Sequence, residues 1–474
     1  MKTRLAIAFL SFLLTIARSS FSETPYLKPV DPSVSVAPVL TVGGSVPRTS
    51  DKSQSFRLIG ETDGLGLLKE ADGTVKLWVN HELEKTDVSQ PVPGTPLQTG
   101  AFVSLFQLAS DRPAPVSGDF AASTLFLGTQ AWGRIPALFC SGNLSGAEVG
   151  FDRPIYFTGE EATGNQSGDG RGGMGFAFTG GNAYALPELG RYRKENLVVV
   201  PGTGLKTLLF GLEDGPKGLN SELYLYIGEK KLSSTDPLER NGLTGGRLYV
   251  LGSATDGRND ETTFHKINSP LVGRWIPVDG ASGLTDDELD AKASAAGAFR
   301  FDRIEDGTYD RRRNGVFYFV TTGGGSANAK GRLYKLTFNP KDPLASPMIL
   351  EILIEGDAGD PIVSPDNIDM NADGEMLILE DFTLDNFWTY LKRNNSVWLY
   401  RPDGNSKPVR IAEAAAKGWE PTGVIDASSV YGPGSWILDV QAHTRSSAAA
   451  SAAAGLTGDA QLVEGGQILL LRTR

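Results

Sequence analysis

Acidic side chains recur directly after short apolar runs in this sequence. Asn80-His81-Glu82 follows KLWV, Glu160-Glu161 follows PIYFT and one glycine, and Glu380-Asp381 follows MLIL. Calcium takes about six to eight oxygen ligands from carboxylates, amide side chains, backbone carbonyls and water. Loops of this kind, brought together by a fold, form a cage for a divalent cation. The alternative for any single pair is a solvated surface turn.

Other residues able to bind metals or phosphate lie between and after these pairs. They are Cys140, Glu195, Arg303, Glu305, Asp366, Asn367, Glu420 and His443. Cys140 is the only cysteine, so an intramolecular disulfide is excluded. It is either a small buried apolar residue or a thiolate metal ligand. A histidine in a loop can likewise be either a metal ligand or a hydrogen-bonded structural residue.

Several function classes lack their signatures. The sequence contains no HExxH, no GxSxG and no phosphate-cradling GxxxxGK[ST]. The Gly-rich run from Gly172 to Gly181 opens no recognisable helix and is interpreted as a loop. The net charge of −11 comes without any basic stripe, which argues against nucleic acid as a partner.

Composition indicates the elements that position these residues. The chain has 57 glycines and 27 prolines, and Gly/Asp/Asn clusters separate short strand-like runs such as Phe102–Leu108 and Ser396–Tyr400. Few helices are expected, the clearest over Thr285–Ala296. A turn, a strand and a polar residue at the strand end recur, as at Asp72 to Asn80. This unit favours an all-β fold, a β-propeller with loop insertions, over a sandwich or a barrel.

The sequence also predicts how the chain is divided into segments. Residues 1–22 have a basic start and an apolar stretch of about 13 residues, which indicates a secretory signal peptide and a secreted or periplasmic protein. No later segment is apolar enough for a membrane anchor. Residues 23–55 are expected to be an extended N-terminal arm, and residues 56–474 a single propeller domain. We expect the protein to be a monomer.

An ordered series of motifs resembles the PhoX-type alkaline phosphatase family over about residues 60 to 445. The matching segments are FCSG (139–142) with GEE (159–161), LGRYRKE (189–195), DRIEDG (302–307), SPDNIDMNADGEMLILED (364–381), WEPTG (419–423) and ILDVQAH (437–443). The SPDN segment matches most closely. Six weak matches in the family's order carry more weight than any one of them.

This resemblance implies a six-bladed propeller that cleaves phosphate monoesters of small metabolites at a mixed Fe³⁺ and Ca²⁺ site. Carried over by position, Cys140 and Glu195 become ligands of iron. The implied ligands of calcium, or bridges between metals, are Glu160 or Glu161, Glu305, Asp366 and Asn367. Arg303 would hold the substrate phosphate and, with Glu305, act in catalysis. Glu82, Asp381, Glu420 and His443 complete the expected site.

The sequence departs from the family pattern in several places. Lys194 stands where the family has histidine, Ile304 replaces the proline of RPED, and Ala442 separates Gln441 from His443. The start of the chain also lacks paired arginines. Two other functions therefore stay open: a calcium-stabilised binding propeller without turnover, and a different metal-dependent hydrolase, such as a lactonase or a phytase-like enzyme, on the same scaffold.

Overall fold

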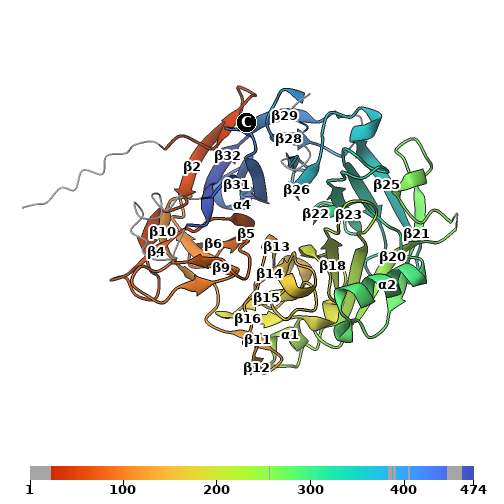
Figure 1. The fold of residues 1–474 in the computed structure, drawn as a ribbon, viewed down its shortest axis with the longest axis horizontal. Helices are drawn as coiled ribbons and strands as arrows, with labels where there is room; N and C mark the ends of the chain where they lie inside the picture. Colours follow the sequence, from red (N-terminus) through yellow and green to blue (C-terminus); the bar gives the residue numbers. More distant parts are fainter. Residues whose placement is uncertain are drawn as a thin grey trace, which may run out of the picture.

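The computed structural model describes residues 23–255, 257–382, 387, 391–403, 406–445 and 462–473 of the chain. Within these residues the strands form six four-stranded antiparallel blades arranged in a ring (Figure 1). The predicted all-β fold, a six-bladed propeller, is confirmed. The expected signal peptide, residues 1–22, lies outside the described residues.

The first three blades follow one another along the chain. Their strands, from the channel outward, are β5 (Thr62–Lys69), β6 (Val75–His81), β9 (Phe102–Leu108) and β10 (Pro115–Phe120); β13 (Phe139–Ser145), β14 (Ile155–Glu160), β15 (Gly175–Thr179) and β16 (Asn182–Ala185); β17 (Lys194–Val199), β18 (Lys206–Glu213), β19 (Leu223–Glu229) and β20 (Arg247–Ser253). The Gly-rich run expected as a loop thus contains β15, because its Phe176 and Phe178 are buried on this strand.

The other three blades complete the ring. Their strands are β22 (Ile304–Tyr309), β23 (Val316–Thr321), β24 (Arg332–Thr337) and β25 (Met348–Glu355); β26 (Pro365–Met370), β27 (Met376–Glu380), β28 (Ser396–Tyr400) and β29 (Val409–Ala414); β30 (Glu420–Asp426), β31 (Ser435–Arg445), β32 (Glu464–Arg472) and β2 (Ser35–Thr41). An additional strand, β21 (Leu271–Val278), bridges the outer edges of the third and fourth blades.

Shorter strands and helices lie outside the six four-stranded blades. They are the strands β1 (Leu27–Pro29), β3 (Ser45–Pro47), β4 (Ser55–Arg57), β7 (Val88–Ser89), β8 (Gln98–Thr99), β11 (Leu125–Leu127) and β12 (Gln130–Ala131), and the helices α1 (Pro237–Arg240), α2 (Asp286–Ala296) and α4 (Ser428–Tyr431). Helix α2 confirms the helix expected after Thr285, whose side chain caps it in a capping box with Glu288. No helix in the described ranges is long and apolar enough to cross a membrane.

The two ends of the chain close the ring together. Strand β2, from the segment expected as an arm, is the outermost strand of the last blade and pairs with β32 from Ser35↔Arg472 to Thr41↔Gln467. Strand β1 adds to the fifth blade by pairing with β29. The outermost strand of the last blade is therefore joined to its neighbour β32 by hydrogen bonds, and no short loop of the chain connects the two strands.

Apolar side chains pack between neighbouring blades. The rings of Phe210 on β18 and Phe317 on β23 stack with centroids 4.2 Å apart, inside a cluster that joins the third and fourth blades. Other clusters join the remaining neighbours, such as the one around Phe56, Phe106 and Ile437 between the first and last blades. Because these cores lie between the sheets, the innermost strands are free to carry polar side chains along the channel.

The innermost strand of every blade has the same irregularity. Its pairing with the second strand skips between Thr62 and Leu65, Phe139 and Gly142, Lys194 and Leu197, Ile304 and Gly307, Pro365 and Ile368, and Thr422 and Ile425. Such β-bulges bend a strand and re-aim its side chains. In the first five blades the bulge comes directly after the first residue of the strand, and in the sixth it comes after Thr422, the third residue of β30.

The closure of the ring gives a prediction. A chain beginning at Val42 lacks β1 and β2 and leaves the edges of β29 and β32 unpaired. We expect its unfolding temperature to fall by at least about 10 °C and its tendency to aggregate to rise. Thermal unfolding and size-exclusion chromatography test this against a chain beginning at Glu23. Equal unfolding temperatures for the two chains would contradict it.

Candidate metal centre

A cavity of about 470 Å³ opens at the end of the channel where the innermost strands begin. It is lined by Glu61, Asp63, Glu82, Glu84, Asp87, Leu138, Cys140, Glu161, Arg193, Glu195, Asp214, Arg303, Glu305, Asp366, Asp381, Glu420, Gln441 and His443. Ten of the predicted site residues therefore meet in one place. They come from positions far apart in the sequence.

Two repeated positions in the blades supply most of this lining. The first is the start of the innermost strand, which carries Asp63, Cys140, Glu195, Glu305, Asp366 and Glu420. The second is the residue directly after the second strand, which carries Glu82, Glu161, Asp214 and Asp381. The two positions are adjacent because the first residue of the innermost strand pairs with the end of the second, as in Phe139↔Glu160 and Pro365↔Glu380.

The acidic side chains form a continuous series of candidate metal sites. Four groups have one ligand atom per residue, all within 4.8 Å of one another: Asp63–Glu82–Cys140, Cys140–Glu161–Glu195, Glu195–Glu305–Asp366, and Asp366–Asp381–Glu420. Neighbouring groups share a residue. Metal–oxygen distances of about 2.3–2.6 Å are compatible with ligand atoms at these separations. The arrangement can hold several cations side by side.

Cys140 occupies the junction of two of these groups. Its Sγ lies 3.3 Å from Glu195 Oε1 and 3.7 Å from Asp63 Oδ2. Burial, and then the charges of Asp63 and Glu195, raise the pKa of the thiol well above its usual range. A bound cation reverses this effect, because a coordinating thiol is deprotonated. The position fits the thiolate interpretation of the lone cysteine better than simple packing.

Two arginines supply the positive charge of the cavity. The Arg303 guanidinium pairs with both oxygens of Asp214, at 2.9 and 3.1 Å, and lies 2.9 Å from Glu305 Oε1. Arg193 contacts Glu161 and lies 3.2 Å from Asp214 Oδ2. Burial raises the pKa of Asp214, but Arg303 and Arg193 outweigh it and hold the pKa below its usual range. Asp214 is therefore an ionised anchor for both guanidinium groups.

Arg303 holds its position at a conformational cost. Its φ of 59° lies in the left-handed region, which costs a non-glycine residue about 1–3 kcal/mol. Leu138 and Ser364, at the same place before the innermost strands of the second and fifth blades, have φ of 52° and 47°. Strain at this entry to the strand is thus a repeated feature that directs the following side chains into the channel.

A second polar layer lies below the carboxylates. Ser141 Oγ donates to Glu195 Oε1 at 2.6 Å and accepts from Asn367 Nδ2 at 2.9 Å. Thr422 Oγ1 lies 2.6 Å from Asn367 Oδ1 and 2.9 Å from Asp63 Oδ2. Ser141 and Asn367 directly follow Cys140 and Asp366 on their strands, and Thr422 is two residues after Glu420. Asn367, predicted as a ligand, lies here and is outside the cavity lining, where it orients Ser141 and Thr422.

Glu160 and Glu161 have different places. The Glu160 carboxylate accepts hydrogen bonds from the backbone amides of Ala137, Gly168 and Met174 at 2.8–3.1 Å and faces away from the cavity. Glu161, the next residue, lines it. The prediction left the two undecided; the geometry assigns the candidate ligand position to Glu161.

His443 closes the cavity at the last blade. Its Nε2 lies 2.9 Å from Glu420 Oε2 and its Nδ1 lies 3.4 Å from Glu464 Oε1. Burial lowers its pKa, but these two carboxylates outweigh burial and raise the pKa to about 11. His443 is therefore protonated, and it acts here as a cationic partner of Glu420.

Crowding of the carboxylates perturbs their protonation. Burial, followed by repulsion from neighbouring carboxylates, raises the pKa of Asp63, Glu195 and Asp366 well above the usual range. Burial also raises the pKa of Glu82 to about 7. Without cations the cluster holds protons that it would release on metal binding.

The sequence reasoning missed several residues of the cavity. Asp63, Arg193 and Asp214 contact predicted site residues, and the others are Glu61, Glu84, Asp87 and Leu138. Asp214 follows the apolar strand LLFGLE just as Glu161 and Asp381 follow theirs, so aligning the blades would have found it. Asp63 lies at the start of its strand as Asp366 does. Lys194, a departure from the family pattern, points away from the cavity and donates to the carbonyls of Gly173 and Gly190 at 3.0 and 2.9 Å.

The family model of the alkaline phosphatase PhoX matches residues 182–418, half of the 474-residue chain. This chain belongs to the PhoX alkaline phosphatase family. The matched part includes Glu195, Arg303, Glu305 and Asp366 of the cavity. No match was found among curated proteins.

The chain is also similar to solved structures. PhoX from Pseudomonas fluorescens, in complex with the transition-state analogue vanadate, is similar with a TM-score of 0.64 and 14% identity, over 93% of this chain and 95% of that chain. A protein of unknown function from Dyadobacter fermentans covers 94% of this chain and 100% of that chain with a TM-score of 0.42 and 9% identity. The first likeness supports the propeller fold of this PhoX family member.

The different surroundings of Glu160 and Glu161 give a prediction. Glu160→Gln places an amide against three backbone donors, and we expect it to lower the free energy of unfolding by about 1–3 kcal/mol while bound metal is unchanged. We expect Glu161→Gln to lower the metal content and leave the metal-free fold stable. Urea unfolding in chelator and elemental analysis measure the two effects. The reverse pattern would show the assignment to be wrong.

The raised pKa of Glu82 gives a second prediction, on the pH dependence of stability. Its folded pKa of about 7 exceeds the ordinary value of 4.5, so the folded state binds the extra proton. The stabilisation from this proton is complete below about pH 4.5 and disappears as the pH rises through about 7. In chelator, we expect Glu82→Gln to match the wild type at pH 5 and to unfold at a temperature several degrees higher at pH 8.

Thermal unfolding between pH 5 and 8 measures this difference. Glu375→Gln, a glutamate outside the cavity on the loop before β27, is the matched control and should follow the wild type. A constant difference between Glu82→Gln and the wild type across this range would contradict the prediction.

Proposed function

We propose that this protein is an exported, metal-dependent phosphatase that hydrolyses phosphate monoesters in the propeller channel. One observation carries the proposal. Four overlapping ligand groups, one thiol and two arginines tied to a single aspartate line the same cavity. Family membership supports a phosphatase-type hydrolase, and the expected signal peptide supports export.

The residues present fit bound cations. Asp63 Oδ1 is buried and has no hydrogen-bond partner among the described residues, although Asp63 lines the cavity. A buried carboxylate oxygen without a partner costs free energy that a cation would recover. The mutual repulsion that raises the pKa of Glu195 and Asp366 also disappears when cations lie between the carboxylates.

The donor atoms favour two kinds of metal. The groups that contain Cys140 offer sulfur with oxygen, a set suited to a transition metal such as iron. The groups Glu195–Glu305–Asp366 and Asp366–Asp381–Glu420 offer oxygen alone, which suits calcium. We therefore assign iron to Cys140, Glu161 and Glu195, and calcium to the carboxylate groups on the other side of Glu195.

The two arginines are placed to receive the phosphate. The planar guanidinium of Arg303 suits phosphate oxygens, and its position is fixed by Asp214. Arg193 Nε is buried and has no hydrogen-bond partner in the described part of the chain, so a donor is available. Donors fixed before the reaction stabilise charge that develops on the transferring group. Bound cations would add polarisation of the phosphoryl group.

Glu305 connects the arginines of this site with its candidate metal ligands. It lies 2.9 Å from Arg303 Nη2 and belongs to the group with Glu195 and Asp366. It thus orients the guanidinium from one side while Asp214 holds it from the other. This arrangement supports the role of Arg303 and Glu305 as the catalytic pair.

The size and charge of the cavity suggest the substrates. A volume of about 470 Å³ suits a small molecule. Glu61, Glu84 and Asp87 line the cavity on the side of the first blade and would repel the repeated phosphates of a nucleic acid. We propose small phosphorylated metabolites as substrates and a monomer as the active form.

Hydrolysis of p-nitrophenyl phosphate tests the proposal. We expect activity that is lost in chelator and restored by calcium, together with iron and calcium in the purified protein. Arg303→Gln should lower kcat/KM by about 100- to 1000-fold, because it removes a preorganised donor to the phosphoryl oxygens. Elemental analysis checks that the variant keeps its metals.

Arg312→Gln is the control, since Arg312 pairs with Asp310 and Asp403 away from the cavity. We expect wild-type activity for it. A metal-loaded protein that cleaves neither phosphate monoesters nor diesters, and whose stability depends on calcium, would instead be a binding propeller.

A further inference from the structure

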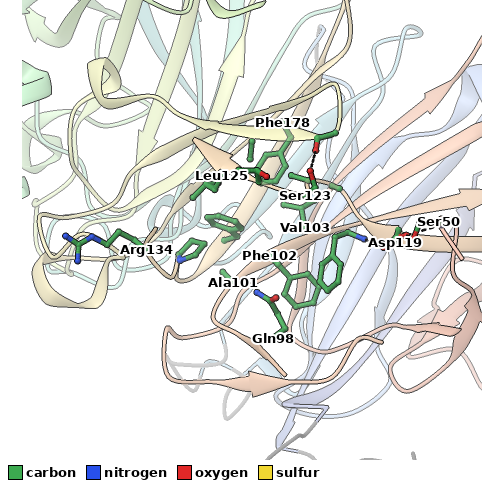
Figure 2. A pocket seen from close by; sticks show the side chains of 18 of the residues that line it. Ser50, Gln98, Ala101, Phe102, Val103, Asp119, Ser123, Leu125, Arg134 and Phe178 are labelled. Atoms are coloured by element: carbon green, nitrogen blue, oxygen red, sulfur yellow. Dashed lines mark hydrogen bonds between the residues drawn. The ribbon is translucent and has the colours of Figure 1, made fainter. Parts of the chain in front are cut away.

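A second cavity, of about 690 Å³, lies between the first and second blades. Its wall contains the rings of Phe102, Phe120, Phe139 and Phe178, with Ala101, Val103, Ala121, Leu125 and Ala183 between them. Figure 2 shows Leu125 and Phe178 on one side of this pocket and Phe102 and Gln98 on the other. A pocket of this size with an aromatic wall has the character of a ligand site.

The positive and negative charges around this pocket do not cancel. Asp119 is already satisfied: its carboxylate accepts from Arg48 Nε at 3.0 Å, from the Ser50 amide at 3.1 Å and from Ser50 Oγ at 2.5 Å. Arg134 lines the opposite border, is exposed, and has no ion-pair partner among the described residues. The uncompensated charge at the pocket is therefore positive.

Two half-exposed apolar side chains lie next to lining residues of the pocket. Leu97 and Ile135, which flank Gln98 and Arg134, are 43% and 44% exposed. Ile135 lies against Gly100, where a Cβ would come within 2.3 Å of Ile135 Cγ2, so the two segments meet beside the pocket.

This pocket is separate from the metal centre, although the two share a wall. Pro136 and Phe139 line the pocket, whereas Leu138 and Cys140 line the acidic cavity. Strand β13 and the residues before it therefore present different side chains to each cavity. The acidic cavity is lined mostly by charged side chains and contains no phenylalanine.

We propose that the pocket between the first two blades binds an amphiphilic carboxylate, an acyl chain that ends in one carboxylate group. The chain lies against the phenylalanine rings, and the carboxylate pairs with Arg134 at the border. The guanidinium presents a planar pair of donors that matches a carboxylate. This site goes beyond the proposed phosphatase function and does not depend on it.

Isothermal titration calorimetry of the full metal-loaded protein tests the site with decanoate, decanol and acetate. We expect decanoate to bind with one equivalent, decanol to bind about tenfold more weakly, and acetate to show no heat. Arg134→Gln should weaken decanoate about tenfold and leave decanol unchanged. Ala122→Trp, which fills the pocket from a partly exposed position, should weaken both ligands.

Two controls locate the binding. Arg112→Gln replaces an arginine whose side chain is 71% exposed away from the pocket, and it should bind decanoate as the wild type does. Inorganic phosphate, which is directed at the acidic cavity, should not displace decanoate. The proposal is overturned if no decanoate binds, if phosphate competes with it, or if Arg134→Gln and Ala122→Trp both bind like the wild type.

Discussion

Repulsion among carboxylates held at one level of the channel is the constraint on which this structure depends. Six innermost strands begin around the cavity, and five of them bulge directly after their first residue. The fold thereby fixes the buried carboxylates of Asp63, Glu195, Glu305 and Asp366 around one cavity. Two arginines and one histidine balance part of the charge, and cations between the carboxylates would balance the rest. A site of this composition is stable mainly in its loaded state.

The polar layer beneath the carboxylates explains how such a ring keeps its shape. Ser141, Asn367 and Thr422 bond to one another and reach both Glu195 and Asp63. Gly64 occupies the corresponding place in the first blade, because a Cβ there would lie 2.2 Å from the backbone nitrogen of Gly142. Connected hydrogen bonds of this kind rigidify a buried polar region. The ligands above are therefore oriented before any cation arrives.

Much of this arrangement was accessible from the sequence. Acidic pairs after apolar runs predicted Glu82, Glu161 and Asp381, and the family resemblance added Cys140, Glu195 and Arg303. The sequence did not separate Glu160 from Glu161, since that choice depends on which side of the strand end faces the channel. Asp214 was missed because its role arises only when Arg303, from the next blade, reaches it. The contribution of β2 was also hidden, because the pairing of distant chain ends leaves no local pattern.

The pairing of β2 with β32 has a consequence for how the molecule is made. Strand β2 precedes the other strands of the six blades and β32 follows them, so the sixth blade stays incomplete until residue 472 has been synthesised and has left the ribosome. An early strand without its neighbour presents open hydrogen-bonding groups to other chains. Any cation captured earlier would meet an open arc of carboxylates, with Glu420 and its partner His443 still missing. Assembly of the centre is thus tied to the final step of folding.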